Sequence, residues 1–180
     1  MAKNCVTEKT ARRQEWIENG LLELMAKTKF DQITVSELCR HLNLSRRSFY
    51  RYFRDLEDVL ESALDHVFQR MAMPSNLPDL EELRRNYEFW LENRAVLDAL
   101  SHSGMMEKLY EYIYRYTDAR ALVDVLLPQD QQLLREISMF ATAGSVALAI
   151  SWYQDGFRRT PEEMARIARR MLFEPLLKQK

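Results

Sequence analysis

Residues 34–54, TVSELCRHLNLSRRSFYRYFR, constrain the fold of this chain more than any other stretch, and they indicate two short helices joined by a tight turn. Thr34 and Glu37 have the spacing of a capping box, so a helix is expected to begin directly after Thr34. Asn43 stands where the chain must turn, and asparagine is second only to glycine in tolerating a left-handed conformation. Ser45 is a favourable N-cap for the second helix.

The second helix is predicted to separate cationic from aromatic side chains. On a helical wheel of about 100° per residue, an arc of roughly 140° holds Arg46, Arg47, Tyr50, Arg51 and Arg54. The other side holds Phe49, Tyr52 and Phe53. From Arg40 to Arg54 there are five arginines and no acid, although the formal net charge of the chain is only −1.

This charge pattern favours a helix-turn-helix that reads DNA, because such a motif needs a short exposed helix supported by a partner helix. Arginine suits the task, since its planar guanidinium donates two parallel hydrogen bonds to phosphate or guanine. The alternative interpretation is a solvated charged face on an ordinary helical hairpin. Caps, turn residue, apolar face and charge agree independently, and their agreement disfavours that alternative.

Residues 10–65 resemble the N-terminal domain of the tetracycline-repressor (TetR/AcrR) family. The run FDQITVSELCRHLNLSRRSFYRYFRDLEDVL is similar to the family's pattern of a Phe, a Thr-Val helix start, a Leu-x-Val/Leu-Ser turn and a Tyr-x-Tyr-Phe ending. The resemblance implies an all-α, dimeric transcriptional regulator with a ligand-responsive C-terminal domain. Lys29 and Asn43 stand where the family usually has glycine. Leu56 stands where it often has a lysine that contacts phosphate, a difference that would weaken contact with the DNA backbone.

The remainder of the chain is also expected to be helical, which makes the predicted fold class all-α. The 180 residues include only four glycines and five prolines, and no segment alternates like a strand. The segment MPSNLPD, residues 73–79, is the natural boundary. It divides a helix-turn-helix DNA-binding domain with a connecting helix, 1–73, from a helical ligand-binding and dimerisation domain, 74–180. Residues 1–7 are expected to be a loose arm from which Lys3 reaches DNA.

Further helices are expected from Asp79, at 118–127, at 129–156 and at 161–174. Thr160, Pro161 and Glu163 combine a cap, a helix-starting proline and a capping box, and Gly156 is expected to stop the helix before them. The segment ISWYQDGFRRTPEEMARIARRML is similar to the C-terminal region of a subgroup of the family, that of a dihydroxyacetone-operon regulator. This similarity bears on architecture and not on ligand specificity.

The composition argues against several other classes of protein. The N-terminus MAKNCVTEK has no apolar secretory core. The longest weakly polar run, Met139–Ile150, has 12 residues, whereas a bilayer span needs about 20. Two cysteines give no disulfide framework. The expected location is the cytoplasm, with no membrane association.

Catalysis, cofactors and metal binding are not expected from this sequence. His41, His66 and His102 are scattered and contain no i, i+4 pair. No glycine-rich phosphate loop or nucleophile elbow occurs. We therefore expect a protein that is not an enzyme.

Three sets of candidate site residues follow. The candidate DNA-binding residues are Thr34, Ser45, Arg46, Arg47, Ser48, Tyr50, Arg51 and Tyr52. A small-molecule pocket is predicted near the break at 102–104, and its candidate residues are Phe89, Trp90, His102, Met105, Met106, Tyr110, Tyr114, Phe140 and Trp152, although such side chains are more often plain core. A homodimer interface is predicted to contain Leu148, Trp152, Met164, Ile167, Ala168 and Met171.

Two functions remain open at this point. The first is a dimeric repressor that a small molecule of unknown identity releases from a palindromic, double-stranded DNA operator. The second is a co-regulator on the same fold, which acts through a protein partner that replaces the small-molecule signal.

Overall fold

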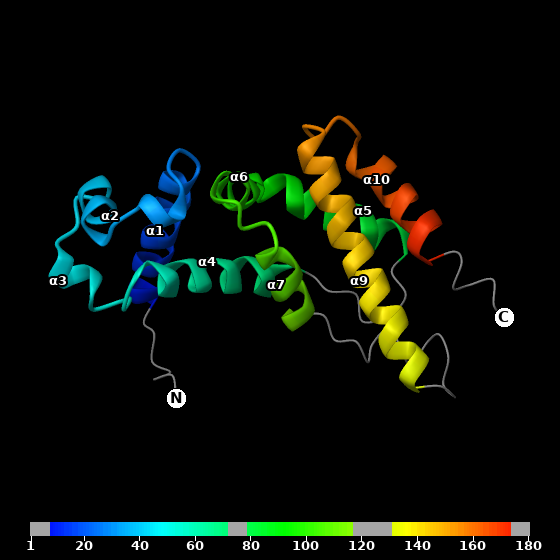
Figure 1. The fold of residues 1–180 in the computed structure, drawn as a ribbon, viewed down its shortest axis with the longest axis horizontal. Coiled ribbons are helices and arrows are strands. Elements are labelled where there is room, and N and C mark those ends of the chain that lie inside the picture. The colour runs from blue at the N-terminus through cyan, green and yellow to red at the C-terminus, as the bar shows by residue number, and fades with distance from the viewer. Residues whose placement is uncertain (1–7, 72–78, 117–130, 174–180) are drawn as a thin grey trace. The chain divides into compact units, whose positions relative to one another are not determined.

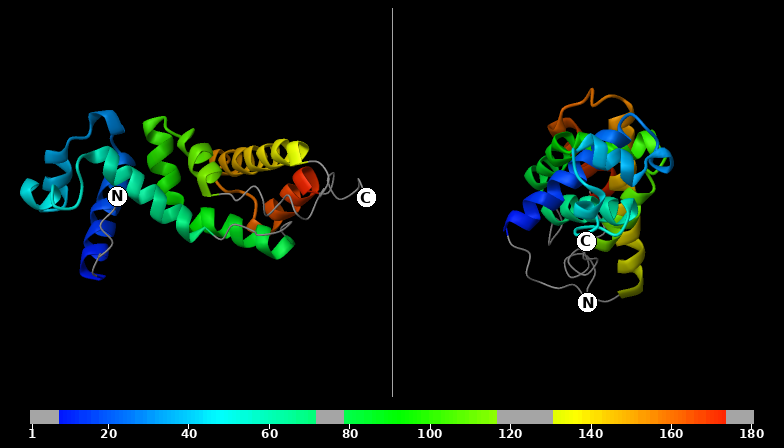
Figure 2. Two further views of the ribbon diagram at one scale, coloured as in Figure 1. Left: turned by 90° about the horizontal axis from the view of Figure 1, so that it is seen from below. Right: turned by 90° about the vertical axis from the view of Figure 1, so that its left-hand side faces the viewer.

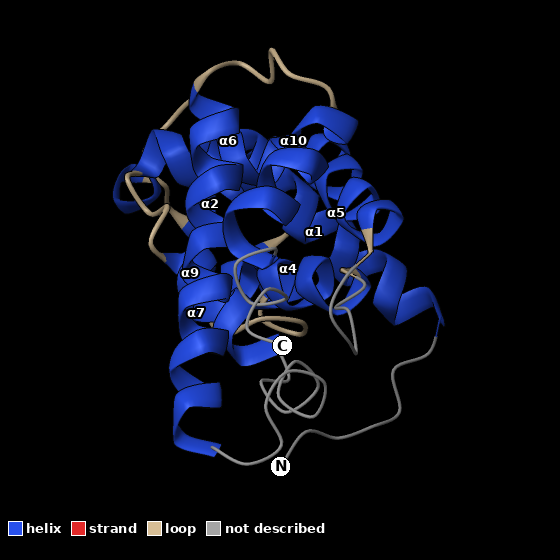
Figure 3. Ribbon diagram, turned by 90° about the vertical axis from the view of Figure 1, so that its right-hand side faces the viewer, coloured by secondary structure: helices blue, strands red, loops and turns tan. Residues whose placement is uncertain are grey.

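The computed structural model describes residues 8–71, 79–116 and 131–173. These residues form helices and loops and contain no strand (Figure 3), so the predicted all-α class is confirmed. The predicted arm at 1–7 with Lys3, the boundary segment at 73–78 and the helix at 118–127 lie outside these ranges.

The chain divides into two compact units, and neither is continuous in sequence. The first unit comprises Met1–Val67 and Ala95–Met105, and the second comprises Phe68–Arg94 and Met106–Lys180. The boundary predicted at residue 73 separates a DNA-binding domain from a ligand-binding and dimerisation domain, and this functional division stays a prediction. The packing itself places residues 95–105 with the N-terminal helices.

The first unit contains the predicted helix-turn-helix (Figure 1). Its elements are α1 (Glu8–Met25), η1 (Phe30–Gln32), α2 (Val35–His41), α3 (Arg46–Phe49), most of α4 (Leu56–Arg70) and most of α6 (Arg94–Ser103). The inner side of α1 is buried, and Ile17, Leu21 and Met25 have no exposed surface. Gly20 on α1 allows the close approach of α2, because a Cβ at this position would lie 2.5 Å from Cδ2 of Leu42.

A buried carboxylate joins α1 to α4 inside this unit. Glu18 is 3% exposed. Its carboxylate accepts a hydrogen bond of 2.7 Å from the Ser62 hydroxyl and lies 2.8 Å from Nδ1 of His66. A buried charge is tolerated when it is paired and hydrogen-bonded. Glu18 therefore fixes the position of α4 against the helix that supports α2.

The second unit is built around α5 (Leu80–Glu92), α7 (Lys108–Tyr116), α9 (Gln131–Gln154), α10 (Pro161–Ala168) and the π-helical turn η2 (Arg169–Phe173). α10 packs along α5, and α9 contacts α7 and η2 (Figures 1 and 2). Tyr87 of α5 and Trp152 of α9 meet edge to face, with ring centroids 5.5 Å apart. Leu172 packs so closely on Gly144 that a Cβ there would lie 2.5 Å from its Cδ2.

The turn between α9 and α10 confirms the predicted helix stop. α9 ends at Gln154, and Gly156 has a φ of 71°. Phe157 also has a left-handed φ, 58°, which is costly for a residue with a side chain. Its ring packs on Trp152, with centroids 4.7 Å apart, and the Trp152 indole donates a 2.9 Å hydrogen bond to the carbonyl of Arg159. These contacts hold the turn that precedes the capping box at Thr160.

Candidate nucleic-acid interface

The start of α2 is held by the predicted capping box. The Thr34 hydroxyl accepts a 3.2 Å hydrogen bond from the Glu37 backbone N–H, and the Thr34 N–H donates to the Glu37 carboxylate at 2.8 Å. Hydrogen bonding by the Thr34 side chain, more than any other contact, lowers the pKa of Glu37. The capping box fixes the direction in which α2 begins. The direction of α2 in turn sets the path of the chain that leads to α3.

The turn between the two helices also forms as expected. Asn43 adopts a φ of 47°, the left-handed conformation that asparagine tolerates. The Leu44 N–H then donates a 2.8 Å hydrogen bond to the Cys39 carbonyl, and the Leu44 side chain is buried. The Ser45 hydroxyl caps α3 by accepting a 3.1 Å hydrogen bond from the Ser48 N–H.

The second helix is shorter than predicted. α3 ends at Phe49, so the helical wheel extended to Arg54 is wrong for Arg51 and Arg54. The reason is competition from the next helix. Asp55 accepts a 2.9 Å hydrogen bond from the Asp58 N–H, and the Asp58 carboxylate accepts one of 2.8 Å from the Arg54 N–H. These side-chain bonds take the place of helical bonds at the start of α4.

The aromatic side chains on α3 and after it behave as predicted. Phe49 has no exposed surface and Phe53 is 4% exposed, whereas Tyr50 is 50% exposed. The Phe49 ring lies edge to face against Tyr50, at 5.3 Å between centroids, and 6.2 Å from the ring of Phe53. Phe49 and Phe53 therefore anchor α3 to the core while Tyr50 remains on its outer side.

The arginines of this surface differ in how they are engaged. Arg46 donates a 3.3 Å hydrogen bond to the Tyr50 hydroxyl, and this bond is the main reason why the pKa of Arg46 is raised. Arg54 forms a 3.2 Å ion pair with Asp58. Arg47 and Arg51 are exposed, and within the described ranges neither forms an ion pair with an acid. Among the arginines of α3 and the residues that follow it, these two therefore have the greatest freedom to meet an external anion.

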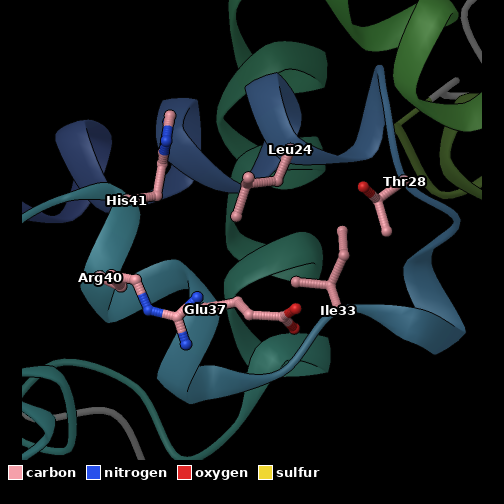
Figure 4. A pocket seen from close by; sticks show the side chains of 6 residues that line it. All are labelled: Leu24, Thr28, Ile33, Glu37, Arg40 and His41. Atoms are coloured by element: carbon pink, nitrogen blue, oxygen red, sulfur yellow. The ribbon is translucent and has the colours of Figure 1, made fainter.

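Two hollows flank α2, and sequence periodicity gave no signal for either. One has a volume of about 410 Å³ and is lined by Leu24 of α1, by the connecting residues Thr28 and Ile33, and by Glu37, Arg40 and His41 of α2 (Figure 4). The other has a volume of about 620 Å³, lies between α2 and α3, and is lined by Ser36, Cys39, Arg40, Asn43, Leu44, Ser45 and Arg46. Arg40 lines both.

The residues predicted for a small-molecule pocket fall in both units. His102 and Met105 belong to the first unit, and the others belong to the second. Trp90 and Trp152 are each 2% exposed, which agrees with the plain-core alternative for these two side chains. Tyr110, Tyr114 and Phe140 are exposed. The pocket as a whole stays a prediction.

The residues predicted for a dimer interface also separate by burial. Trp152, Met164 and Ala168 lie inside the protomer's own core, at 2%, 3% and 1% exposure, so they leave almost no surface for a partner. Met164 and Ala168 lie on α10, which packs along α5, and the Trp152 ring of α9 packs on Tyr87 of α5. The interface as a whole stays a prediction. Leu148 and Ile167 are half-buried, and Met171 is 59% exposed.

Within the described residues, no group of three or more His, Cys, Asp or Glu side chains is placed to hold a metal ion. In the same ranges, no helix is both long and apolar enough to cross a bilayer.

Two family models match the sequence. The model described as "Bacterial regulatory proteins, tetR family" matches residues 19–63, and the one described as "Transcriptional regulator C-terminal region" matches residues 80–174. A search of curated proteins gives no significant match.

Solved structures share the fold at low sequence identity. The dihydroxyacetone kinase operon activator DhaS is 16% identical, with 92% of this chain and 94% of that chain covered and a TM-score of 0.64. A protein of Syntrophomonas wolfei assigned to the TetR-family regulators is 15% identical, with coverage of 93% and 96% and a TM-score of 0.65. A TetR-family regulator of Streptomyces coelicolor is 20% identical, with coverage of 93% and 83% and a TM-score of 0.59.

Proposed function

Because the chain belongs to the TetR family of bacterial transcriptional regulators, we propose that it is a dimeric repressor that leaves a palindromic DNA operator when a small molecule binds. The family predicted from residues 10–65 is confirmed. Members of this family regulate transcription and are not enzymes. A regulator of this kind works in the cytoplasm, where bacterial DNA lies.

The observation that carries the proposal is the surface around α3. A capped, four-residue helix is anchored by Phe49 and exposes Arg47 and Tyr50. The N-terminal residues of a recognition helix are those that reach base edges in a helix-turn-helix. We assign Arg46, Arg47, Ser48 and Tyr50 to the major groove, and Thr34, Ser45, Arg51 and Tyr52 to the backbone or to support of the reading helix.

The test is selection of bound DNA sites with the purified full chain, followed by binding measurements at several salt concentrations. Enrichment of a palindrome with a half-site spacing of roughly 34–36 Å supports the repressor proposal. Failure to enrich any sequence, together with a protein partner that co-purifies, would favour the co-regulator instead.

Replacing Arg47 by alanine is expected to weaken binding to the selected site and to relax base preference in each half-site. A guanidinium that donates two hydrogen bonds to guanine contributes about 1–3 kcal/mol of discrimination, so affinity should fall by roughly fivefold to 150-fold. The measurement is a titration of matched and single-base-changed DNA. The control is Arg85→Ala, on the exposed side of α5 in the other unit. Equal weakening on every sequence would assign Arg47 to phosphate rather than to a base.

A small-molecule effector and DNA are expected to weaken each other's binding by the same factor. Linkage between two sites is reciprocal, because both ligands act on one conformational equilibrium, and only a ligand that prefers the released form shifts it. The measurement is a thermal-shift screen of metabolites, followed by titration of a hit with and without operator DNA. Equal ligand affinity in the two titrations would contradict release by that ligand.

A further inference from the structure

We propose that Arg40 binds a phosphate of the DNA backbone in the hollow between α2 and α3, in addition to the contacts assigned above. The inference rests on the proposed DNA-binding function and extends it. Arg40 is not among the residues predicted to contact DNA, and it lies on the first helix of the motif, not on the reading helix.

The lining of this hollow favours an anion. Its apolar floor is formed by Cys39 and Leu44, which are 5% and 8% exposed. Its polar side chains are two guanidinium groups, two hydroxyls and one amide, and they come from Arg40, Arg46, Ser36, Ser45 and Asn43. No carboxylate belongs to the lining. Guanidinium, hydroxyl and amide groups are the side-chain groups that proteins commonly present to DNA phosphates.

The hollow of about 410 Å³ on the other side of α2, which Arg40 also lines, is a useful comparison. Its lining contains both basic and acidic side chains. That hollow includes the Glu37 carboxylate (Figure 4). Its His41 lies with Nε2 2.9 Å from a Glu23 carboxylate oxygen. Since Thr34 hydrogen bonds lower the pKa of Glu37, this acid keeps its negative charge and disfavours a phosphate there. Of the two hollows, only the one between α2 and α3 is lined without an acid.

Arg40 is also available for such a contact. Its side chain is exposed, and in the described parts of the chain it makes no ion pair with an acid, whereas Arg54 is paired with Asp58. Glu37 lies one turn earlier on the same helix, but its carboxylate is held by the N–H and hydroxyl of Thr34, each at 2.8 Å. The Arg40 guanidinium therefore keeps donors that can bind an external oxyanion.

The position of Arg40 agrees with how this motif docks. The first helix of a helix-turn-helix crosses the DNA backbone while the second lies in the major groove. A phosphate bound between the two helices would set the depth and register of α3 without reading a base. Arg40 therefore contributes affinity that is independent of sequence, unlike Arg47.

The experiment compares the full-length protein with Arg40→Gln, Arg40→Lys and the distant control Arg85→Gln, on the selected operator and on a scrambled duplex, from 50 to 200 mM salt. For Arg40→Gln we expect an affinity loss of about tenfold on both duplexes and a salt slope that is shallower by about 0.9. Arg40→Lys should keep the slope because it keeps the charge. Thermal unfolding of each variant reports whether the fold is intact.

The outcomes separate the inference from the function on which it rests. If the unmodified protein binds DNA and Arg40→Gln keeps its salt slope, the phosphate contact is wrong while the DNA-binding function stands. A loss of affinity on the operator but not on the scrambled duplex would make Arg40 a base-reading residue and would also overturn the proposal. If the unmodified protein selects no DNA, both fail. Should Arg40→Gln unfold, Arg40→Met takes its place, because methionine also removes the charge and favours a helix as glutamine does. A salt slope shallower by about 0.9 then supports the proposal, and an unchanged slope overturns it.

Discussion

Replacing Phe49 by alanine is expected to abolish DNA binding by unfolding the motif that presents the reading helix. Phe49 has no exposed surface, and truncating a buried phenylalanine to alanine costs about 3–5 kcal/mol. Native domains are stable by only about 5–15 kcal/mol. The lost stability affects a helix of only four residues. Such a helix has few backbone hydrogen bonds of its own and depends on the packing of Phe49.

The measurements are thermal unfolding and titration of operator DNA, made on the same preparations. We expect the melting temperature to fall by roughly 10 °C or more, with binding lost before the rest of the chain unfolds. Phe49→Leu keeps most of the apolar volume and should recover both properties. Tyr50→Phe is the matched control, because it removes only the hydroxyl that accepts the Arg46 hydrogen bond and should leave stability almost unchanged. A normal melting temperature for Phe49→Ala would contradict the anchoring role.

The parts of this fold that could be predicted from the sequence are those that depend on residues three or four positions apart. Thr34, Asp79 and Thr160 were each expected to begin a helix, and each forms the reciprocal side-chain and backbone bonds of a capping box. Asn43 was expected to turn left-handed and does. Such features involve a side chain and its own local backbone, so no knowledge of tertiary packing is needed.

The end of α3 was missed because two local signals compete. Apolar and aromatic spacing favours a helix that continues beyond Phe49, while Asp55 and Asp58 favour a new start. The helical periodicity of the side chains reflects the apolar and aromatic spacing only, and contains no information on where the next helix is capped. In the structure the capping bonds of α4 prevail, and Arg51 and Arg54 lie outside the helix.

The candidate sites expose a different limit of the sequence argument. An apolar stripe predicts that a helix face is buried, but it does not say whether the same chain or a second copy covers that face. Met164 and Ala168 have the spacing expected of an interface, yet both are buried within the protomer, where α10 packs along α5. Their burial within one chain depends on the tertiary packing of α10, which the spacing does not contain. The two hollows beside α2 depend on tertiary packing for the same reason.

Replacing Met171 by glutamate is expected to convert a dimer into monomers and, with it, to remove tight operator binding. The proposed interface is supported by large apolar side chains of the second unit that the protomer leaves exposed, among them Met139, Phe140 and Met171, at 45%, 68% and 59%. Apolar side chains exposed close together commonly mark an interface. Phe140 lies one turn before Gly144, on which Leu172 packs, so α9 and η2 present Phe140 and Met171 from neighbouring elements.

Because Met171 is already exposed in the protomer, the substitution should leave the fold of a single chain intact. In a symmetric dimer it would bury a carboxylate from each copy without a partner. An uncompensated buried charge costs about 3–5 kcal/mol, so the dimer dissociation constant should rise more than hundredfold. Two half-sites bound by one dimer gain from effective concentration, and monomers lose that gain.

Sedimentation across a range of protein concentrations measures dimer dissociation, and operator titration measures the loss of tight DNA binding. Gln154→Glu adds the same charge at an exposed position near the end of α9 and should remain dimeric. A Met171→Glu protein that sediments as a dimer of unchanged affinity would place the interface elsewhere on the second unit.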